Sequence, residues 1–296
     1  MIAGPVHSPA FSAKAESPWQ GAWRRFSAHR TTLAALAGLV LLILLCSVGP
    51  YFSPYSETAQ DLQLAAAGPS WKHWLGTDGL GRDLATRVLF GGRISLLVGL
   101  LATLVASAIG VTYGMVAGVV GGRTDAMMMR VVDILYAFPF MTFVILLTAM
   151  FGRHFVLIFI AIGAVEWLTM ARVIRGQVMA LTQQEFITAA RGFGTGFGHV
   201  LWKHLLPNVI GIVIVYGSLT VPGVMMFEAT LSFLGLGIQP PGASWGVLIS
   251  EGAAAIQSYP WLLLAPAGFF SATLLALNTL GDSLRDALDP KSMPGM

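Results

Sequence analysis

The stretch ISLLVGLLATLVASAIGVTYGMVAGVV, residues 94–120, decides the class of fold. It contains no charged residue and exceeds the roughly 20 residues that a helix needs to cross a hydrocarbon core of about 30 Å. Small residues, which let helices approach closely in lipid, recur along it at Gly99, Ser107, Gly110, Gly114 and Gly118. The stretch therefore predicts a membrane-spanning helix with close helical neighbours.

The composition of the whole chain agrees with this membrane class. Of the 296 residues, 55% are hydrophobic and 10% are charged, whereas soluble domains carry about 25% charged residues. The mean hydropathy is +0.74. Cys46 is the single cysteine, which excludes a disulfide within the chain.

Six apolar segments are long enough to cross a bilayer. They lie at residues 31–50, 94–120, 133–151, 155–171, 208–235 and 260–281. We therefore expect an all-α integral membrane protein with six transmembrane helices. Residues 1–30 are too long and polar for the start of a cleavable signal peptide. Within them, Arg24 and Arg25 are interpreted as charge flanking the first span rather than as a twin-arginine signal.

The placement of basic residues predicts the orientation, because cytoplasmic segments carry an excess of lysine and arginine. Most of the 17 such residues lie in inner segments if the N-terminus is cytoplasmic. We expect both termini on the cytoplasmic side of the cytoplasmic (inner) membrane. The chain is then divided into a cytoplasmic segment 1–30, a first helix 31–50, an extracytoplasmic segment 51–93, a transmembrane core 94–281 with a cytoplasmic loop at 172–207, and a cytoplasmic tail 282–296.

Two predicted outer segments are long enough to be lids, docking surfaces or connectors, and composition alone favours connectors. Residues 51–93 hold turn formers and both signs of charge, and their candidate outer contacts are Asp78, Arg82 and Asp83. In residues 236–259, Pro240 and Pro241 stop a helix.

The sequence gives little support for catalysis or for a bound metal. It has no GxxxxGK[ST] phosphate loop, and the alternating glycines at 192–198 follow no predicted strand. The six histidines form no HExxH pattern and no cluster with cysteine, so we expect no metal site. No nucleophile and base stand at a typical spacing, and an enzyme is not indicated.

Two acids lie in apolar runs, where a charge at mid-bilayer costs about 2.5–3.5 kcal/mol on insertion scales. Glu228 is either a pathway or gate residue, or an acid held by internal hydrogen bonds or by protonation. We leave these two interpretations open. Glu166 lies near an inner end, and we expect it to pair with Arg172 or Arg175.

The segment EFITAARGFGTGFGHVLWKHLLPN, residues 185–208, interrupts the apolar chain near its middle. Its pattern predicts a helix from about 176 to 191, a break at Gly192, Gly194, Gly196 and Gly198, and a short amphipathic stretch that ends at Pro207. Such a unit fits either insertion into a groove of another protein or a helix that lies on lipid. The pattern alone does not separate the two.

This segment resembles the cytoplasmic "EAA" loop of ABC importer permeases, whose form is EAA, three residues, Gly, nine residues and Ile-x-Leu-Pro. Matching positions are Ala189, Ala190, Gly194, Leu206 and Pro207. The chain departs from the pattern at Thr188, where Glu is usual, and at His204, where Ile is usual. The first departure removes a possible salt bridge.

The resemblance extends over nearly the whole chain after residue 20. LGTDGLGRDLATRVLFGGRISLLVG (75–99), MMMRVVDILYAFPF (127–140), FEATLSFLGLGIQPPGASWG (227–246) and LGDSLRDALDP (280–290) are similar to segments of peptide and nickel permeases. The chain most resembles the C-type permease subunit of the oligopeptide and dipeptide ABC importers, and residues 143–177 favour the oligopeptide branch.

The resemblance implies a type I importer permease fold and a subunit that hydrolyses nothing itself. The implied partners are a B-type permease, two ATPase subunits or domains that bind ATP and Mg, an extracytoplasmic peptide-binding protein and membrane lipid, with no nucleic acid. The implied ATPase-coupling residues are Glu185, Thr188, Ala189, Ala190, Arg191, Gly192, Gly194, Leu206 and Pro207. Alternatives are a permease for nickel or another small solute, a stand-alone secondary transporter, and an intramembrane enzyme or receptor.

Overall fold

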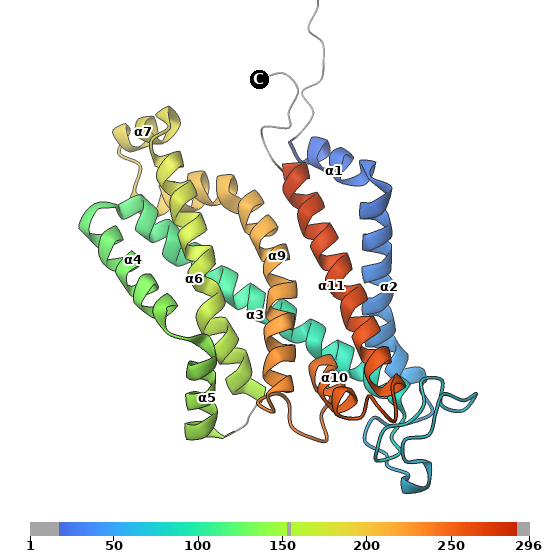
Figure 1. Ribbon diagram of the computed structural model, residues 1–296. Helices are drawn as coiled ribbons and strands as arrows, with labels where there is room; N and C mark the ends of the chain where they lie inside the picture. Colours follow the sequence, from blue (N-terminus) through green and yellow to red (C-terminus); the bar gives the residue numbers. More distant parts are fainter. Residues whose placement is uncertain (1–17, 153–154, 289–296) are drawn as a thin grey trace, which may run out of the picture.

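A computed structural model describes residues 18–152 and 155–288 of the chain (Figure 1). These residues form helices and connecting loops, and an isolated bridge between Thr77 and Asp83 is their only β contact. The predicted all-α fold is confirmed. Residues 1–17 of the predicted N-terminal segment and residues 289–296 of the predicted tail lie outside the described part.

Five long helices build most of the bundle. They are α2 (Arg30–Phe52), α3 (Leu84–Val120), α6 (Phe155–Thr182), α9 (Leu206–Phe233) and α11 (Trp261–Leu288). Within the described ranges, α2, α3, α11 and the continuous helix that contains α9 are long and apolar enough to cross a membrane. The pair α4 (Gly122–Ala137) and α5 (Phe140–Phe151) is a fifth candidate. α6 covers the remaining predicted segment, and the count of six spans stays a prediction.

Two predicted segments contain more helix than the apolar spans indicated, and their membrane boundaries stay predictions. α3 begins at Leu84, so its first turns lie within the predicted outer segment 51–93. α6 continues to Thr182 and extends into the predicted loop 172–207. The arginines in these helical turns form ion pairs with acids of the loop and of α4.

The predicted span 133–151 contains a sharp break, because it joins parts of two helices. α4 and α5 meet at an angle of 77°. Pro139 is the N-cap residue of α5 and has no amide hydrogen to donate. Its ring also disfavours helical geometry at Phe138, which has an extended backbone. The apolar sequence continues across this break, and so the pattern concealed it.

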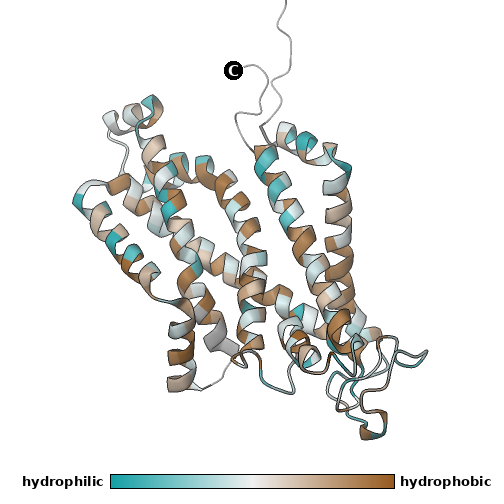
Figure 2. Ribbon diagram, viewed as in Figure 1, coloured by the Kyte–Doolittle hydropathy of each residue, from teal (hydrophilic) through white to brown (hydrophobic). Residues whose placement is uncertain are grey.

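The bundle has two distinct ends (Figure 1). α1 (Pro18–Ala28), α7 (Glu185–Gly192) and the last turn of α11 lie at one end, which we call the α7 end. α10 (Trp245–Ala254) and the long loop that contains η1 (Leu62–Leu64) lie at the other, the α10 end. Figure 2 shows hydrophobic residues along the middle of α2 and hydrophilic residues at α1 and α7.

A row of glycines in α3 brings its backbone against α6. A Cβ added at Gly114 would lie 2.5 Å from the carbonyl oxygen of Ala171, and one at Gly110 would lie 2.7 Å from the carbonyl oxygen of Trp167. Because these neighbours are backbone atoms, they cannot rotate away. Small residues supply the close van der Waals contact on which helix association in lipid depends. The predicted close neighbour of α3 is therefore α6.

α1 is fixed to the end of α11 by an arginine. The Nε and Nη2 atoms of Arg25 donate to the carbonyl oxygen of Ala287 at 3.1 and 2.7 Å. A hydroxyl pair between Thr32 and Ser283, 2.8 Å apart, joins α2 to the same helix. A cation suits the last carbonyls of a helix, which have no partner within it. The described start of the chain is thus held at the α7 end.

The glycine row yields a prediction about stability. Gly114→Ala should lower the free energy of unfolding by about 1–3 kcal/mol, because the added methyl group overpacks the α3–α6 contact. Gly38→Ala is the control, since a Cβ at Gly38 would have no neighbour within 4 Å and alanine favours the helix. The measurement is thermal unfolding in detergent. Equal melting temperatures for the two variants would contradict the close packing.

Candidate functional sites

The segment that resembles the EAA loop forms a compact bend at the α7 end. We call it the elbow, residues 185–207, which comprises α7, a glycine turn and the start of the next helix. Ile187 points inward and is fully buried, whereas Thr188 and Ala189 are exposed. Ala190 is half-buried. α7 therefore presents the small side chains of Thr188 and Ala189 on its surface, with the exposed Glu185 in its first turn.

The first helix of the elbow ends in a left-handed turn at Gly194. The amide of Thr195 donates to the carbonyl oxygen of Ala190 at 3.2 Å, and Gly194 has a φ of +77°. This six-residue hydrogen bond with a left-handed glycine is a Schellman ending. Four glycines were predicted to break the helix. Only Gly194 among them has a positive φ, whereas Gly192 still belongs to α7 and Gly198 lies in α8 (Phe197–His199).

The sequence pattern predicted that the second part of the elbow ends at Pro207. In the structure the helix continues past this proline. α8 continues through the π-helical segment η2 (Val200–Leu205) into α9 without a break. Pro207 has no amide hydrogen and its ring crowds the carbonyl four residues earlier, which a wider turn relieves. The side chain of Asn208 donates to the carbonyl oxygen of His204 at 2.6 Å. Leu206 and Pro207 thus sit inside a continuous helix.

The elbow rests on an apolar core shared by five helical segments. We call it the elbow core; its central residues are Met115 of α3, Ile174 of α6, Ile187 of α7, Leu205 of η2 and Val209 of α9. Each of these five side chains is fully buried. Packing at this density transmits displacement, because buried side chains have no free space to move into. A displacement of α7 is therefore transmitted to the adjoining parts of α3, α6 and α9.

Exposed aromatic residues around the elbow were not singled out in the sequence. Phe193 is 90% exposed, and Phe186, Phe197 and Trp202 are also exposed. Aromatic residues are enriched where proteins contact one another. The aromatic positions between the glycines were the signal that could have identified this surface.

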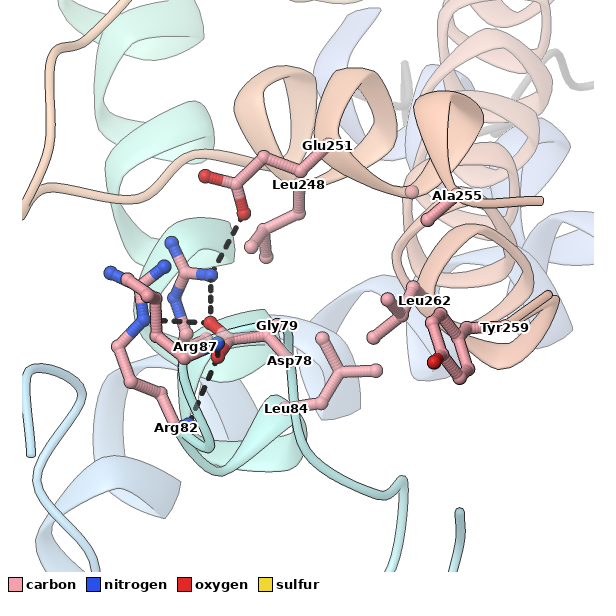
Figure 3. Close-up of a pocket in the computed structure, with 12 residues that line it drawn as sticks. Asp78, Gly79, Arg82, Leu84, Arg87, Leu248, Glu251, Ala255, Tyr259 and Leu262 are labelled. Atoms are coloured by element: carbon pink, nitrogen blue, oxygen red, sulfur yellow. Dashed lines mark hydrogen bonds and ion pairs between the residues drawn. The ribbon is translucent and has the colours of Figure 1, made fainter. Parts of the chain in front are cut away.

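At the α10 end, four charged side chains form a cluster that we call the Asp78 cluster: Asp78, Arg82, Arg87 and Glu251 (Figure 3). The carboxylate of Asp78 accepts from Arg82 Nε at 2.7 Å and from Arg87 Nη1 at 2.6 Å. Arg87 Nη1 also donates to Glu251 at 2.9 Å and ties the loop to α10. Two positive and two negative groups balance, which is how a buried ionic group is tolerated.

The three residues predicted as outer contacts are mostly internal to this end. Asp78, Arg82 and Asp83 are buried, so they shape the loop rather than present charge to a partner. Asp83 caps α3 by accepting from the amide of Thr86 at 2.8 Å. The surface that the loop exposes includes Trp71, which is 97% exposed, and Trp74.

The charge state of Asp78 follows from opposing effects. Burial raises the pKa of its carboxyl group, but hydrogen bonds from Arg82 and from the amide of Leu80, together with the charge of Arg87, lower the pKa below its ordinary value. The carboxylate therefore stays ionised near neutral pH. An open cavity of about 460 Å³ lies beside the cluster and is otherwise lined mainly by apolar side chains such as Leu84 and Leu248 (Figure 3).

Glu228 lies in α9 toward the α10 end and is 1% exposed. Its carboxylate accepts from the hydroxyls of Ser244 at 2.6 Å, Ser232 at 2.8 Å and Ser95 at 3.3 Å. This is the internal hydrogen bonding that the sequence left open as one of two interpretations. In this conformation the side chain reaches no surface of the described chain.

The pairing expected for Glu166 is wrong. Arg172 donates to Asp133 at 2.8 Å, and Arg175 binds Asp125 with two hydrogen bonds of 2.5 and 2.6 Å. Both partners lie in α4, so the arginines of α6 join the two helices. The sequence concealed this because the acids were assigned to a loop and a separate span. Within the described ranges, no group of three or more His, Cys, Asp or Glu side chains could hold a metal ion.

Comparisons with known proteins give two matching family models. Residues 110–293 match the model of the binding-protein-dependent transport system inner membrane component. Residues 17–69 match the N-terminal TM domain of oligopeptide transport permease C.

Several named relatives resemble the chain along most of its length. It is 52% identical over 287 residues to the oligopeptide transport system permease protein OppC of Escherichia coli, which covers 95% of both chains. It is 43% identical over 280 residues to OppC of Bacillus subtilis, with 95% of this chain and 92% of the relative covered. The dipeptide transport system permease protein DppC of Bacillus subtilis is 46% identical over 273 residues, which covers 92% of this chain and 85% of the relative.

The Asp78 cluster yields a second prediction. Asp78→Ala should destabilise the loop at the α10 end by about 3–5 kcal/mol, because it leaves the buried guanidinium of Arg87 without its nearer carboxylate. Hydrogen exchange of residues 53–83 should therefore become faster. Lys72→Ala is the control, since Lys72 is an exposed charge of the same loop. Equal protection in both variants would show that the cluster does not hold the loop.

Proposed function

We propose that the chain is the C-type permease subunit of an ATP-driven importer of peptides. The chain belongs to the family of binding-protein-dependent transport system inner membrane components. The peptide substrate is supported by the names of its relatives, which are oligopeptide and dipeptide permeases. The subunit forms part of the transport route and does not itself hydrolyse ATP. ATP and Mg are bound by partner ATPase chains.

The observation that carries this proposal is the exposed face of α7 around Thr188 and Ala189, which lies on a fully packed base. A partner that docks on Thr188 and Ala189 meets little side-chain bulk, and the exposed Phe193 beside them adds apolar contact area. Helix-in-groove binding depends on such a surface. Because Thr188 replaces the usual acid of the EAA pattern, contact rests on shape and burial rather than on a salt bridge. The docking partner is an ATPase subunit.

The elbow core transmits the ATPase motion into the membrane. Ile187 joins α7 to Leu205 of η2 and Ile174 of α6, so that α7 moves together with the ends of both helices. The glycine row extends this coupling from α6 to α3. ATP binding shifts the transporter between inward-open and outward-open states only to the extent that it favours one of them. A rigid elbow keeps that differential energy from being lost in local bending.

The α7 end is then cytoplasmic and the α10 end extracytoplasmic, with both chain termini inside. The loop at the α10 end receives a peptide-binding protein, and its exposed Trp71 and Trp74 supply contact area for that encounter. The Asp78 cluster holds the loop in shape beneath them. A B-type permease pairs with this chain, and the peptide route runs between the two permeases within the surrounding lipid.

The proposal is tested in the reconstituted complex with its ATPases and binding protein. Ala189→Asp should reduce peptide uptake by about tenfold or more while the complex still assembles, because an unpaired charge is desolvated in the docking contact. Gly194→Val should also uncouple, because valine strains the left-handed turn at φ +77°.

Ala126→Asp is the matched control, since Ala126 is an exposed alanine of α4, a helix outside the elbow. Peptide uptake and ATPase activity are measured together for each variant. Normal uptake in both elbow variants would refute the docking role. Uptake by the purified chain without any ATPase would instead support a stand-alone transporter.

A further inference from the structure

The geometry points to Glu228 as a positioning residue that fixes α10 and links the extracytoplasmic docking surface to the helix that carries the elbow. This inference rests on the proposed function, because it assumes that the binding protein docks at the α10 end. It assigns to Glu228 a role other than contact with the transported peptide. Three features carry it: the direction of the hydrogen bonds, the packing of α10, and the ion pair at the far end of α10.

The direction of each hydrogen bond is set by the α10 backbone. Ser244 Oγ accepts from the amide of Val247 at 3.2 Å, which leaves its hydroxyl hydrogen to donate to Glu228 at 2.6 Å. Ser95 Oγ accepts from the amide of Trp245 at 3.1 Å and donates to the other carboxylate oxygen. Two amides of the first turn of α10 therefore reach the same carboxylate, each through one hydroxyl.

This arrangement also compensates the carboxylate electrostatically. The N-terminus of a helix carries partial positive charge on its free amides. The serines pass that polarity to Glu228, and the hydrogen-bond partners of its carboxylate among the described residues are hydroxyls rather than cations. Each group depends on the other: without the carboxylate, the hydroxyls of Ser244 and Ser95 lose the acceptor that orients them toward the α10 amides, and without the N-cap of α10 the carboxylate loses its Ser244 donor.

Packing prevents α10 from moving independently at this end. A Cβ at Gly246 would lie 2.6 Å from Cα of Ala229, so that α10 lies directly on the backbone of α9. Trp245 is fully buried, and its indole nitrogen donates to the carbonyl oxygen of Val88 in α3 at 2.9 Å. The first turn of α10 is thus bound to both neighbouring helices.

The far end of α10 is bound to the loop that carries the proposed docking surface. Glu251 receives the Arg87 hydrogen bond that connects it to Asp78 in the loop (Figure 3). From Glu228, α9 continues through η2 to the elbow core. Loop, α10, α9 and elbow therefore form a contiguous set of contacts from one end of the bundle to the other.

Ser244→Ala and Ser232→Ala form a matched pair of variants. Each removes one hydroxyl from Glu228, but only Ser244 also holds an amide of α10, whereas Ser232 donates from within α9. Loss of a helix cap should speed hydrogen exchange in Trp245–Ala254 by about fivefold in Ser244→Ala. Exchange in Ser232→Ala should remain unchanged. Equal exchange in the two variants would overturn the positioning role.

The functional test uses the complete complex and compares basal ATPase activity with the activity stimulated by peptide-loaded binding protein. Ser244→Ala and Glu228→Leu should keep basal activity and lose about fivefold or more of the stimulation. Ser232→Ala should keep both. Glu228→Gln should recover part of the stimulation, because its amide oxygen still accepts from Ser244. A residue with only a structural role would change basal and stimulated activity together, or would abolish assembly.

The outcomes separate this inference from the proposed function. A wild-type complex that the binding protein never stimulates would overturn the proposed function. If the wild-type complex is stimulated, and Ser244→Ala and Glu228→Leu are stimulated as strongly as the wild type, the inference alone is overturned. If Ser244→Ala fails to assemble, Glu228→Leu decides, because it removes the acceptor of Ser244, and full stimulation in that variant counts against the inference.

Discussion

The contact between the α6 backbone and the glycine row of α3 is the interaction on which the other features depend. Lipid gives two helices no hydrophobic reason to associate, so their attraction must come from close backbone approach. At Gly114 that approach leaves no room for a methyl group. The same approach brings Ile174 beside Ile187 and Leu205 and so creates the base of the elbow. An elbow without that base would bend locally instead of moving helices.

The two ends of the bundle handle polarity in opposite ways. At the α7 end, the exposed face of α7 offers the small side chains of Thr188 and Ala189 beside Glu185, and exposed aromatic residues surround it, which suits a contact that buries surface against a partner. At the α10 end, charges are buried and matched within the chain, as in the Asp78 cluster. Buried ion pairs contribute little net stability but penalise any arrangement that separates them. The α7 end is therefore suited to contact with a partner, whereas the ion pairs of the α10 end hold its loop in one conformation.

The sequence predicted the features that depend on local composition. Charge-free apolar runs identified the membrane class, and the pattern around Ala189 and Gly194 identified the elbow. It failed where tertiary contacts decide. Arg87 is buried because Asp78 and Glu251 pair with it, and no local pattern shows that pairing. Pro139 interrupts the helix within an apolar run that the pattern treated as continuous. Asp78 was interpreted as a surface charge because its arginine partners also belong to a polar segment.

The central claim is that α7 docks on an ATPase subunit and moves as one body with the adjoining ends of α6 and α9. The most direct measurement is a cryo-electron microscopy map of the complete complex, recorded without nucleotide and with a non-hydrolysable ATP analogue. We expect α7 to contact the ATPase in both states, with the contacts of Ile187 to the elbow core unchanged while the helices shift. A map in which α7 lies in solvent or against lipid headgroups in both states would contradict the account.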